Sequence, residues 1–253
     1  MTLVVAHRGA SGQAPENTME AFRRAAELGA DAVELDVHLT ADGQLAVIHD
    51  ETLDRTTDRR GRVAELTMDE VSGADAGHTF VRADDAGYPF RERGLRVPAL
   101  GDVLAWLPDD IGLVVEIKAR AAVEPTVAAL REHPARRDGR VSVISFDEVA
   151  IEEAHALDPD LTTGYLLVPS QPVEPALMWA TERGHAAVHP WEGDLGTDPS
   201  PLISRAIAYG RLMGCYVVND PERMRQLAAN RLWGFVTDMP DVAREALGPR
   251  QSA

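Results

Sequence analysis

The chain has 253 residues with 41 acidic and 25 basic side chains, which gives a formal net charge of −16 at pH 7. This charge repels polyanions, so nucleic acid and anionic membrane surfaces are not expected as partners, and any anionic ligand has to be held by a local cluster of positive charge. The length fits one large α/β domain or two small ones.

Cysteine usage and apolar patterning indicate the cellular setting. The single cysteine, Cys215, excludes an intramolecular disulfide framework, and its apolar neighbours predict a buried strand thiol. The chain runs into the apolar stretch 3–7 without the pattern of a secretory signal, and no apolar run approaches the ~20 residues that span a bilayer. We therefore expect a cytoplasmic protein with no stable membrane association.

Short apolar runs alternate with longer amphipathic runs along almost the whole chain. The first amphipathic run, residues 18–29, predicts a helix with Asn17 and Glu20 as its N-terminal capping pair and Gly29 as its stop. The apolar runs predict eight strands, at residues 3–7, 32–38, 113–118, 141–145, 161–167, 186–189, 215–219 and 234–238.

Eight strand-then-helix repeats in a chain of this length predict an α/β fold, a (β/α)₈ TIM barrel that spans residues 1–253 as a single catalytic domain. An open doubly wound sheet is the alternative. It is disfavoured because the HRGASG stretch after the first strand has the wrong spacing for a glycine-rich dinucleotide fingerprint.

The regular spacing is interrupted between the second and third predicted barrel strands. Residues 44–50 predict a short strand that returns beside the second strand. Residues 55–96 are rich in Gly, Asp and Arg, and they carry Phe80, Tyr88 and Phe90 but few apolar residues for a core of their own. We interpret residues 55–96 as an inserted lid at the barrel mouth, with a floppy surface loop as the alternative.

Polar residues gather at the carboxyl ends of the predicted strands, where the loops of a parallel barrel form the active face. Residues two positions apart on a strand point to the same side, so Glu34 with Asp36, and Glu116 with Lys118, can face the barrel axis. The polar residues at these strand ends are His7, Arg8, Glu34, Asp36, His49, Asp50, Glu116, Lys118 and His189.

Three of these residues have the chemistry of a metal site. Glu34, Asp36 and Glu116 would repel one another in a barrel mouth, and their pKa values would rise, unless a cation neutralised them. Carboxylate oxygens suit a hard divalent ion, Mg²⁺ or Ca²⁺. Pairing with arginines would explain Glu34 and Asp36 alone, but the third carboxylate favours the metal.

Two histidines and two cations complete the predicted site. His7 and His49 offer imidazoles whose pKa is normally near neutrality, which suits general acid–base chemistry. Arg8 offers a planar fork for an anion such as phosphate, and Lys118 offers a compact point charge. Lys118 is the only lysine of the chain, and a small ammonium fits between metal and phosphate where a guanidinium would crowd the ion.

Several motifs, in this order, resemble the glycerophosphodiester phosphodiesterase family. They are HRGASGQAPENTMEAF at 7–22, ELDVHLTADGQLAVIHDETLDRTTDRRG at 34–61 and VVEIK at 114–118, with weaker agreement through VISF, HPW, YVVN and GFVTDMP. The resemblance spans nearly the whole chain. It implies a TIM barrel with a small inserted region that uses a divalent metal to hydrolyse glycerophosphodiesters to sn-glycerol 3-phosphate and an alcohol.

The resemblance also implies a role for each candidate residue. It implies general acid–base catalysis by His7 and His49, metal binding by Glu34, Asp36 and Glu116, and phosphate binding by Arg8 and Lys118, with His189 reaching the substrate. The chain departs from the family at Tyr216 and Val217, where such proteins often carry tryptophan and threonine. This departure affects the expected contact with the glycerol or the headgroup.

Two other classes of protein fit some of these residues. A metal-dependent sugar isomerase would use the acidic ligands but has little need for both Arg8 and Lys118. A non-catalytic phosphate-ester binding protein would use the cations but not an acid–base pair. The sequence leaves open the alcohol, the choice between Mg²⁺ and Ca²⁺, which histidine is the base, whether a cyclic phosphate forms, and the oligomeric state.

Overall fold

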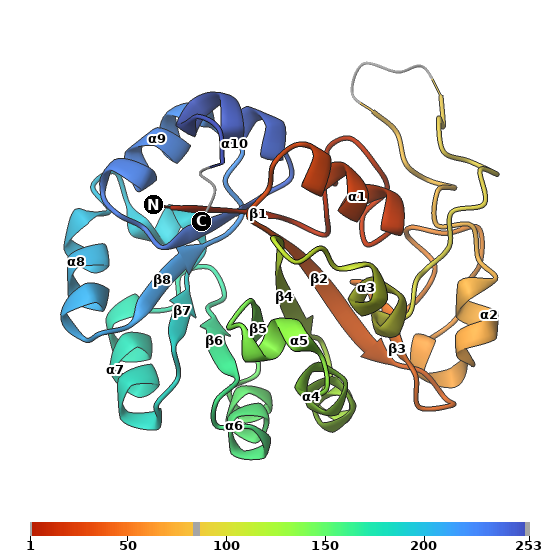
Figure 1. Cartoon of the computed structure of the whole chain (residues 1–253), viewed down its shortest axis with the longest axis horizontal. Coiled ribbons are helices and arrows are strands. Elements are labelled where there is room, and N and C mark those ends of the chain that lie inside the picture. The colour runs from red at the N-terminus through yellow and green to blue at the C-terminus, as the bar shows by residue number, and fades with distance from the viewer. Residues whose placement is uncertain (1, 83–86, 251–253) are drawn as a thin grey trace.

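The computed structural model describes residues 2–82 and 87–250, so positions 83–86 of the predicted insertion and the extreme ends of the predicted domain lie outside the described residues. Within them, eight parallel strands close into a barrel, because β1 pairs with both β2 and β9 (Figure 1). The barrel strands are β1 (Leu3–Ala6), β2 (Ala32–Leu39), β4 (Gly112–Ile117), β5 (Val141–Ser145), β6 (Thr162–Leu166), β7 (Ala187–His189), β8 (Leu212–Cys215) and β9 (Gly234–Thr237).

The predicted barrel is therefore confirmed, and seven of its eight strands lie where the apolar runs placed them. The short return strand is also present, as β3 (Leu45–Val47), which pairs antiparallel with β2 outside the barrel. The seventh prediction, 215–219, was wrong. β8 ends at Cys215, because the register of β7 and β9 pairs the preceding residues 212–215.

The helices lie outside the strands, as Figure 1 shows. The N-cap of the first helix is Thr18, whose side chain accepts a hydrogen bond from the Ala21 backbone, and not the predicted Asn17. Gly29 follows its end in the left-handed conformation, as expected of a stop. The helices are α1 (Met19–Glu27), α2 (Met68–Ser72), α3 (Leu100–Trp106), α4 (Val123–Arg131), α5 (Pro134–Arg137), α6 (Glu148–Leu157), α7 (Val173–Arg183), α8 (Ser200–Ala208), α9 (Pro221–Ala229) and α10 (Pro240–Leu247).

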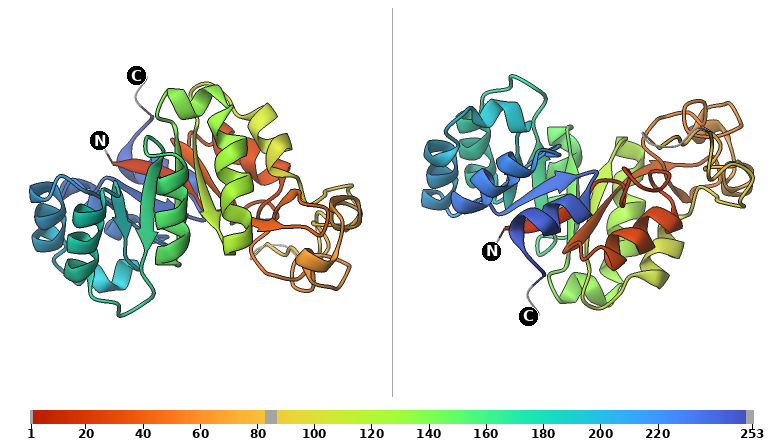
Figure 2. Two further views of the ribbon diagram at one scale, coloured as in Figure 1. Left: turned by 90° about the horizontal axis from the view of Figure 1, so that it is seen from below. Right: turned by 90° about the horizontal axis from the view of Figure 1, so that it is seen from above.

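The segment between β3 and α3 stands out from the side of the barrel beyond β2 (Figure 2). It contains α2 and the 3₁₀ turn Val63–Glu65, and its apolar side chains pack with those of β3. That small cluster consists of Ala46, Ile48, Leu53, Val63, Val71, Ala74, Ala76 and Val97. The segment is therefore anchored to the barrel through the β2–β3 hairpin.

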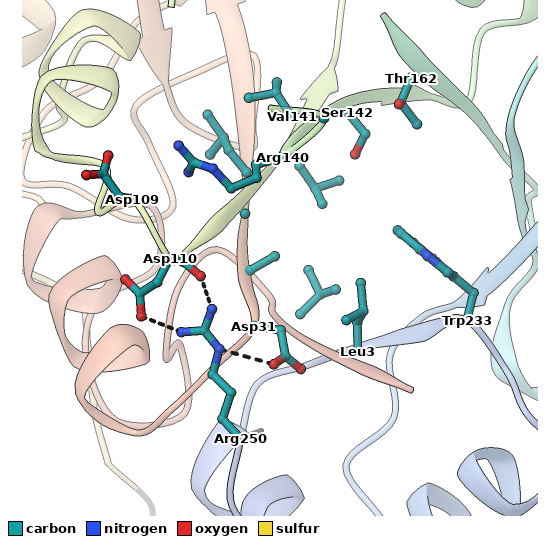
Figure 3. A pocket seen from close by; sticks show the side chains of 16 residues that line it. Leu3, Asp31, Asp109, Asp110, Arg140, Val141, Ser142, Thr162, Trp233 and Arg250 are labelled. Carbon is teal, nitrogen blue, oxygen red and sulfur yellow. Dashed lines mark hydrogen bonds and ion pairs between the residues drawn. The ribbon is translucent and has the colours of Figure 1, made fainter. Parts of the chain in front are cut away.

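The barrel has two chemically different ends. At the amino ends of the strands lies a hollow of about 770 Å³ with a largely apolar lining that includes Leu3, Val114 and Trp233 (Figure 3). On its rim Arg250 pairs with Asp31 and Asp110. The candidate site residues lie at the opposite, carboxyl ends. Across the described residues, no helix has the length and apolar character needed to cross a membrane.

Candidate active site

Three carboxylates converge at the carboxyl ends of β2 and β4. Glu34 and Asp36 lie two positions apart on β2, and Asp36 lies opposite Glu116 in the parallel pairing of the two strands. One ligand oxygen from each residue lies within 4.8 Å of the others, and all three side chains are buried. The alternation on the strands, with the strand register, therefore produces the acidic cluster that the sequence predicted.

Burial and mutual repulsion perturb the cluster strongly. Burial raises the pKa of Glu34 well above its usual value, and the charges of Asp36 and Glu116 raise it further. Burial, with the charge of Asp36, raises the pKa of Glu116 to about 7. Burial also opposes ionisation of Asp36, but Lys118 and Arg8 outweigh it and lower the pKa of Asp36. Without further positive charge, the cluster therefore favours the protonated forms of Glu34 and Glu116 more than water does.

Lys118 lies inside the cluster, directly after β4. Its Nζ donates to Glu116 Oε1 at 2.6 Å and lies 3.1 Å from Asp36 Oδ1. Asp36 Oδ1 nevertheless accepts no well-aligned hydrogen bond in the described part of the chain, so the contact with Lys118 is an ion pair. The ammonium neutralises one side of the cluster.

Arg8 approaches the cluster from the end of β1. Its backbone N–H donates to Glu34 Oε2 at 2.9 Å, and its Nε lies 3.2 Å from Asp36 Oδ2. The turn that directs the Arg8 side chain toward the cluster has a φ of 56° at Arg8 and 83° at Gly9. A Cβ at Gly9 would lie 2.6 Å from the backbone of Ala21 in α1, so only glycine allows this turn to pack against the helix.

Asn17 belongs to the site, although the sequence pattern predicted it to be the N-cap of the first helix. Its side-chain amide donates to Asp36 Oδ2 at 2.8 Å, and its side-chain oxygen accepts the Asp36 N–H at 3.3 Å. Both groups are buried. Asn17 therefore orients Asp36. In the sequence, this role was indicated only by the place of Asn17 in the PENT stretch, next to the residue that caps α1.

His7 lies beside Arg8 at the end of β1 and pairs with Asp238. The His7 Nδ1 lies 2.7 Å from Asp238 Oδ1, and Asp238 also accepts from Ser11 and Asn219. Burial opposes ionisation of Asp238, but these hydrogen bonds, first that of His7, lower its pKa to about 2. An ionised carboxylate only accepts, so Nδ1 carries the proton and Nε2 is the free basic atom.

His49, which follows β3, has the same arrangement. Its Nδ1 lies 2.7 Å from Asp50 Oδ1, and Arg55 donates to both Asp50 oxygens. The Arg55 hydrogen bond, with that of His49, lowers the pKa of Asp50. Burial lowers the pKa of His49 itself, against the field of Asp36. Arg55 also binds Glu16, which accepts from Arg8, so one ionic network joins the insertion to the site.

His189 has different neighbours. Its ring lies between Gly164 of β6 and Gly214 of β8, where a Cβ at either glycine would come within 2.7 Å of it. The same ring meets Trp233 edge-on at 6.1 Å. Burial lowers its pKa to about 4. These contacts place His189 in the barrel interior, and its predicted reach to the substrate stays a prediction.

The acidic cluster fits a hard divalent ion. It offers three carboxylates at metal-site spacing, and one buried oxygen, Asp36 Oδ1, has no hydrogen-bond donor among residues 2–82 and 87–250. Burial raises the pKa of two of the carboxyl groups, and the charge of neighbouring carboxylates raises it further, so a cation bound here would relieve both repulsion and buried charge. The residues could therefore hold a metal ion, with Asn17 and Arg8 orienting the ligands around it.

A closed α/β barrel with an acidic cluster that could hold a metal ion, together with two histidine–carboxylate pairs, fits the active site of a hydrolase. Comparison with known proteins identifies the family. The sequence model of the glycerophosphoryl diester phosphodiesterase family matches residues 7–242. The chain belongs to this family, and the resemblance noted from its motifs is confirmed.

Individual relatives support the same family assignment. The chain is 36% identical over 246 residues to a glycerophosphodiester phosphodiesterase of Caldanaerobacter subterraneus, covering 95% of each protein. It is 32% identical over 256 residues to one of Bacillus subtilis, covering 95% of this chain and 84% of the relative. A phosphodiesterase from Oleispira antarctica, solved with the product sn-glycerol-3-phosphate, superimposes with a TM-score of 0.84 at 26% identity, covering 98% and 97% of the two chains.

Proposed function

We propose that this protein hydrolyses glycerophosphodiesters to sn-glycerol 3-phosphate and an alcohol, with a bound Mg²⁺ or Ca²⁺ and with His7 and His49 as general acid and base. Glu34, Asp36 and Glu116 are the proposed metal ligands. The relatives' names and the product bound to the Oleispira protein support the reaction. The observation that carries the proposal is the pair of histidines, each held through Nδ1 by a carboxylate, beside three buried carboxylates.

Each histidine is prepared to move a proton at Nε2. The carboxylate on Nδ1 fixes the tautomer and stabilises the imidazolium that forms when Nε2 accepts a proton. One imidazole takes the proton of the attacking hydroxyl as its oxygen bonds to phosphorus. The other, as imidazolium, gives a proton to the alcohol oxygen as its bond to phosphorus breaks. The attacking hydroxyl is water or the 2-hydroxyl of the glycerol, and the second route gives a cyclic phosphate that water opens.

Charge on the phosphoryl oxygens is met by cations. We assign Arg8 and Lys118 to the non-bridging oxygens, where their positive charge stabilises the charge that builds up during attack. A divalent ion, when bound, supplies Lewis-acid stabilisation to the same centre. Both side chains are already fixed by the carboxylates they pair with, so little reorganisation is needed when substrate binds.

We also propose that the insertion, residues 55–96, acts as the lid of this site within a single catalytic domain. Arg55 supports this role, because it binds Asp50, the partner of His49, and Glu16, the partner of Arg8. Substrate binding at Arg8 would thus affect the first residue of the insertion directly.

The proposal is tested by stripping the protein with chelator and measuring release of sn-glycerol 3-phosphate from glycerophosphocholine and glycerophosphoethanolamine. Mg²⁺ and Ca²⁺ are then added back separately. We expect one of them to restore turnover, and His7→Ala and Lys118→Ala to lower it by at least about 10²-fold, the usual worth of a general acid–base group.

The matched control is His78→Ala, which removes a histidine from the insertion outside the ionic network of the site. It is expected to keep turnover within about twofold. A folded wild-type protein that cleaves neither diester with either ion would contradict the proposed function.

A further inference from the structure

One arginine, Arg55, joins three separate segments at the mouth of the barrel. Arg55 is the first residue of the insertion, Glu16 lies in the loop between β1 and α1, and Asp50 follows β3. Arg55 donates to Asp50 through Nε at 2.8 Å and through Nη2 at 3.0 Å. It donates to Glu16 through Nη1 at 2.8 Å and through Nη2 at 2.7 Å. The guanidinium therefore binds both oxygens of each carboxylate.

These two carboxylates also hold two of the proposed catalytic and binding side chains. Glu16 Oε1, which is bound by Arg55 Nη2, accepts from Arg8 Nη1 at 2.8 Å. Asp50 Oδ1, which is bound by the same Nη2, lies 2.7 Å from His49 Nδ1. One nitrogen of Arg55 thus lies between the oxygen that orients Arg8 and the oxygen that orients His49. The contacts of Nε and Nη1 fix the planes of both carboxylates, because the guanidinium is a rigid fork.

A neighbouring arginine of the insertion shows the difference from an ordinary surface ion pair. Arg62 donates to Glu51 at 3.0 Å and lies 3.6 Å from Glu65. Its side chain is 55% exposed, and that of Arg55 is 47% exposed, so exposure does not distinguish them. Single exposed contacts stabilise a protein little, whereas bidentate contacts within a network fix geometry. Arg55 has the second kind of contact.

The network is charged near neutral pH. Burial opposes ionisation of Glu16, but the hydrogen bond from Arg55 and the charge of Arg8 outweigh it and lower the pKa of Glu16. Hydrogen bonds to Glu16 and Asp50 raise the pKa of Arg55. The contacts of Arg55 with both carboxylates are therefore charge-assisted, which makes them short and directional.

We propose that Arg55 is the positioning residue that couples phosphate binding to proton transfer in this enzyme. Through Glu16 it orients Arg8 toward the phosphate, and through Asp50 it orients His49 for its proton transfer. The inference rests on the proposed function, since it assigns a role in the same reaction. Orientation matters here because a misplacement of about 1 Å can cost about 10²-fold in rate.

The experiment measures two constants on the ion-loaded protein. The first is kcat, from release of choline or ethanolamine from the two diesters. The second is the constant for competitive inhibition by sn-glycerol 3-phosphate, which reports binding of a phosphate. Arg55→Ala should lower kcat by about tenfold, because His49 loses its orientation. It should raise the inhibition constant by about fivefold, the upper worth of a partly exposed ion pair.

Two further variants separate the two branches of the network. Glu16→Gln weakens the contact with Arg8 and should act mainly on the inhibition constant. Asp50→Asn weakens the support of His49 and should act mainly on kcat. Arg55→Ala should show both effects, a combination that a general loss of stability would not produce.

Chemical rescue distinguishes orientation from charge. Free guanidinium, at concentrations far below those that unfold proteins, can fill the space left in Arg55→Ala and should raise its kcat toward that of wild type. Arg55→Lys keeps the charge without the planar fork, so its kcat should stay below that of wild type. Arg62→Ala is the matched control, because it removes the same charge from the same insertion. It should keep both constants within about twofold and show no rescue.

The outcomes separate this inference from the proposed function. If wild type cleaves neither diester, the proposed function fails and the inference fails with it. If wild type is active and Arg55→Ala matches Arg62→Ala, the inference alone is overturned. A wild-type kcat in Arg55→Lys would also overturn it, because charge alone would then suffice. A low kcat in Arg55→Ala that guanidinium does not raise would do the same, because the loss would then be structural.

Discussion

The two ends of the barrel handle buried charge in opposite ways. At the amino ends of the strands, Asp31 pairs with Arg244 and Arg250, and it also accepts the backbone N–H of Val4 at 2.7 Å. At the carboxyl ends, three buried carboxylates share two cations, Arg8 and Lys118. The first end satisfies its charges, and the second leaves an excess of negative charge.

This difference separates stability from function. A paired carboxylate fixes strands and helices in place, and removing one partner leaves the other charge buried and unpaired. A carboxylate cluster with an excess of negative charge destabilises the fold, and a cation that bound there would gain binding free energy by relieving the repulsion. Substitutions at the two ends should therefore have opposite effects.

The largest expected effect comes from Glu34→Gln at the carboxyl ends. The amide can still accept the Arg8 N–H, so the substitution removes charge more than contact. We expect activity to fall by at least about 10²-fold, because a proposed ligand is lost. We also expect the chelated protein to gain about 1–2 kcal/mol of stability, because repulsion in the cluster is relieved.

Differential scanning calorimetry in chelator and in Mg²⁺ measures the second effect. The shift in Tm that the ion gives wild type should be largely absent from Glu34→Gln. Glu20→Gln, an exposed site on α1, is the control. A chelated Glu34→Gln protein less stable than wild type would show that the cluster stabilises the fold.

The intermediate effect is that of Asp31→Ala at the amino ends. It removes an acceptor from Val4 and the carboxylate partner of Arg244, while Arg250 keeps its pairing with Asp110, so we expect a loss of about 2–3 kcal/mol in the free energy of unfolding. Activity per folded molecule should stay within about twofold, because the site lies at the other end of the barrel. Urea titration with parallel assays measures both.

Asp109→Ala is the control for this variant, because Asp109 lines the same hollow without a described ion pair. A large loss of activity in Asp31→Ala, at temperatures where it is folded, would show that the two ends are coupled.

The smallest effect is a pH dependence at Asp238. Its pKa is lowered to about 2, below the unfolded value, so its ionised form stabilises the fold above the unfolded pKa, and this contribution is lost as the pH falls toward 2. Because the side chain is partly exposed, we expect only about 1 kcal/mol between wild type and Asp238→Asn at pH 5. Urea midpoints at pH 5, 4 and 3 should converge, and a gap that widens in acid would contradict this.

Local sequence patterns predicted most of the barrel, because apolar runs identify buried strands wherever they are placed. The seventh strand was missed for a specific reason. Residues 216–218, YVV, have a stronger β-propensity than 212–214, but the hydrogen-bonding edges of β7 and β9 accept the earlier residues. Pairing between distant strands, which is absent from a local pattern, decided the register.

The candidate site likewise contains residues that a local sequence pattern predicts and residues that only distant contacts bring together. The carboxylate cluster followed from alternation on two strands, which is local. The partner of His49, Asp50, is its neighbour in the chain, but the partner of His7 did not follow from a local pattern, because Asp238 lies 231 positions from His7. Asp238 follows the last barrel strand, so extending the search for polar strand ends to that strand would have found it. No sequence pattern predicted the role of Arg55, because only the folded insertion brings its side chain to Asp50.

One feature of the site also gives the protein a single position for side-chain amine labelling. Lys118 carries the only side-chain amine of the chain, and it is enclosed by Asp36 and Glu116. An amine-directed reagent therefore has a single side-chain target, and its yield at that position reports how open the mouth of the barrel is. Occupancy by ion or substrate can thus be followed by mass spectrometry of one peptide, without an engineered residue.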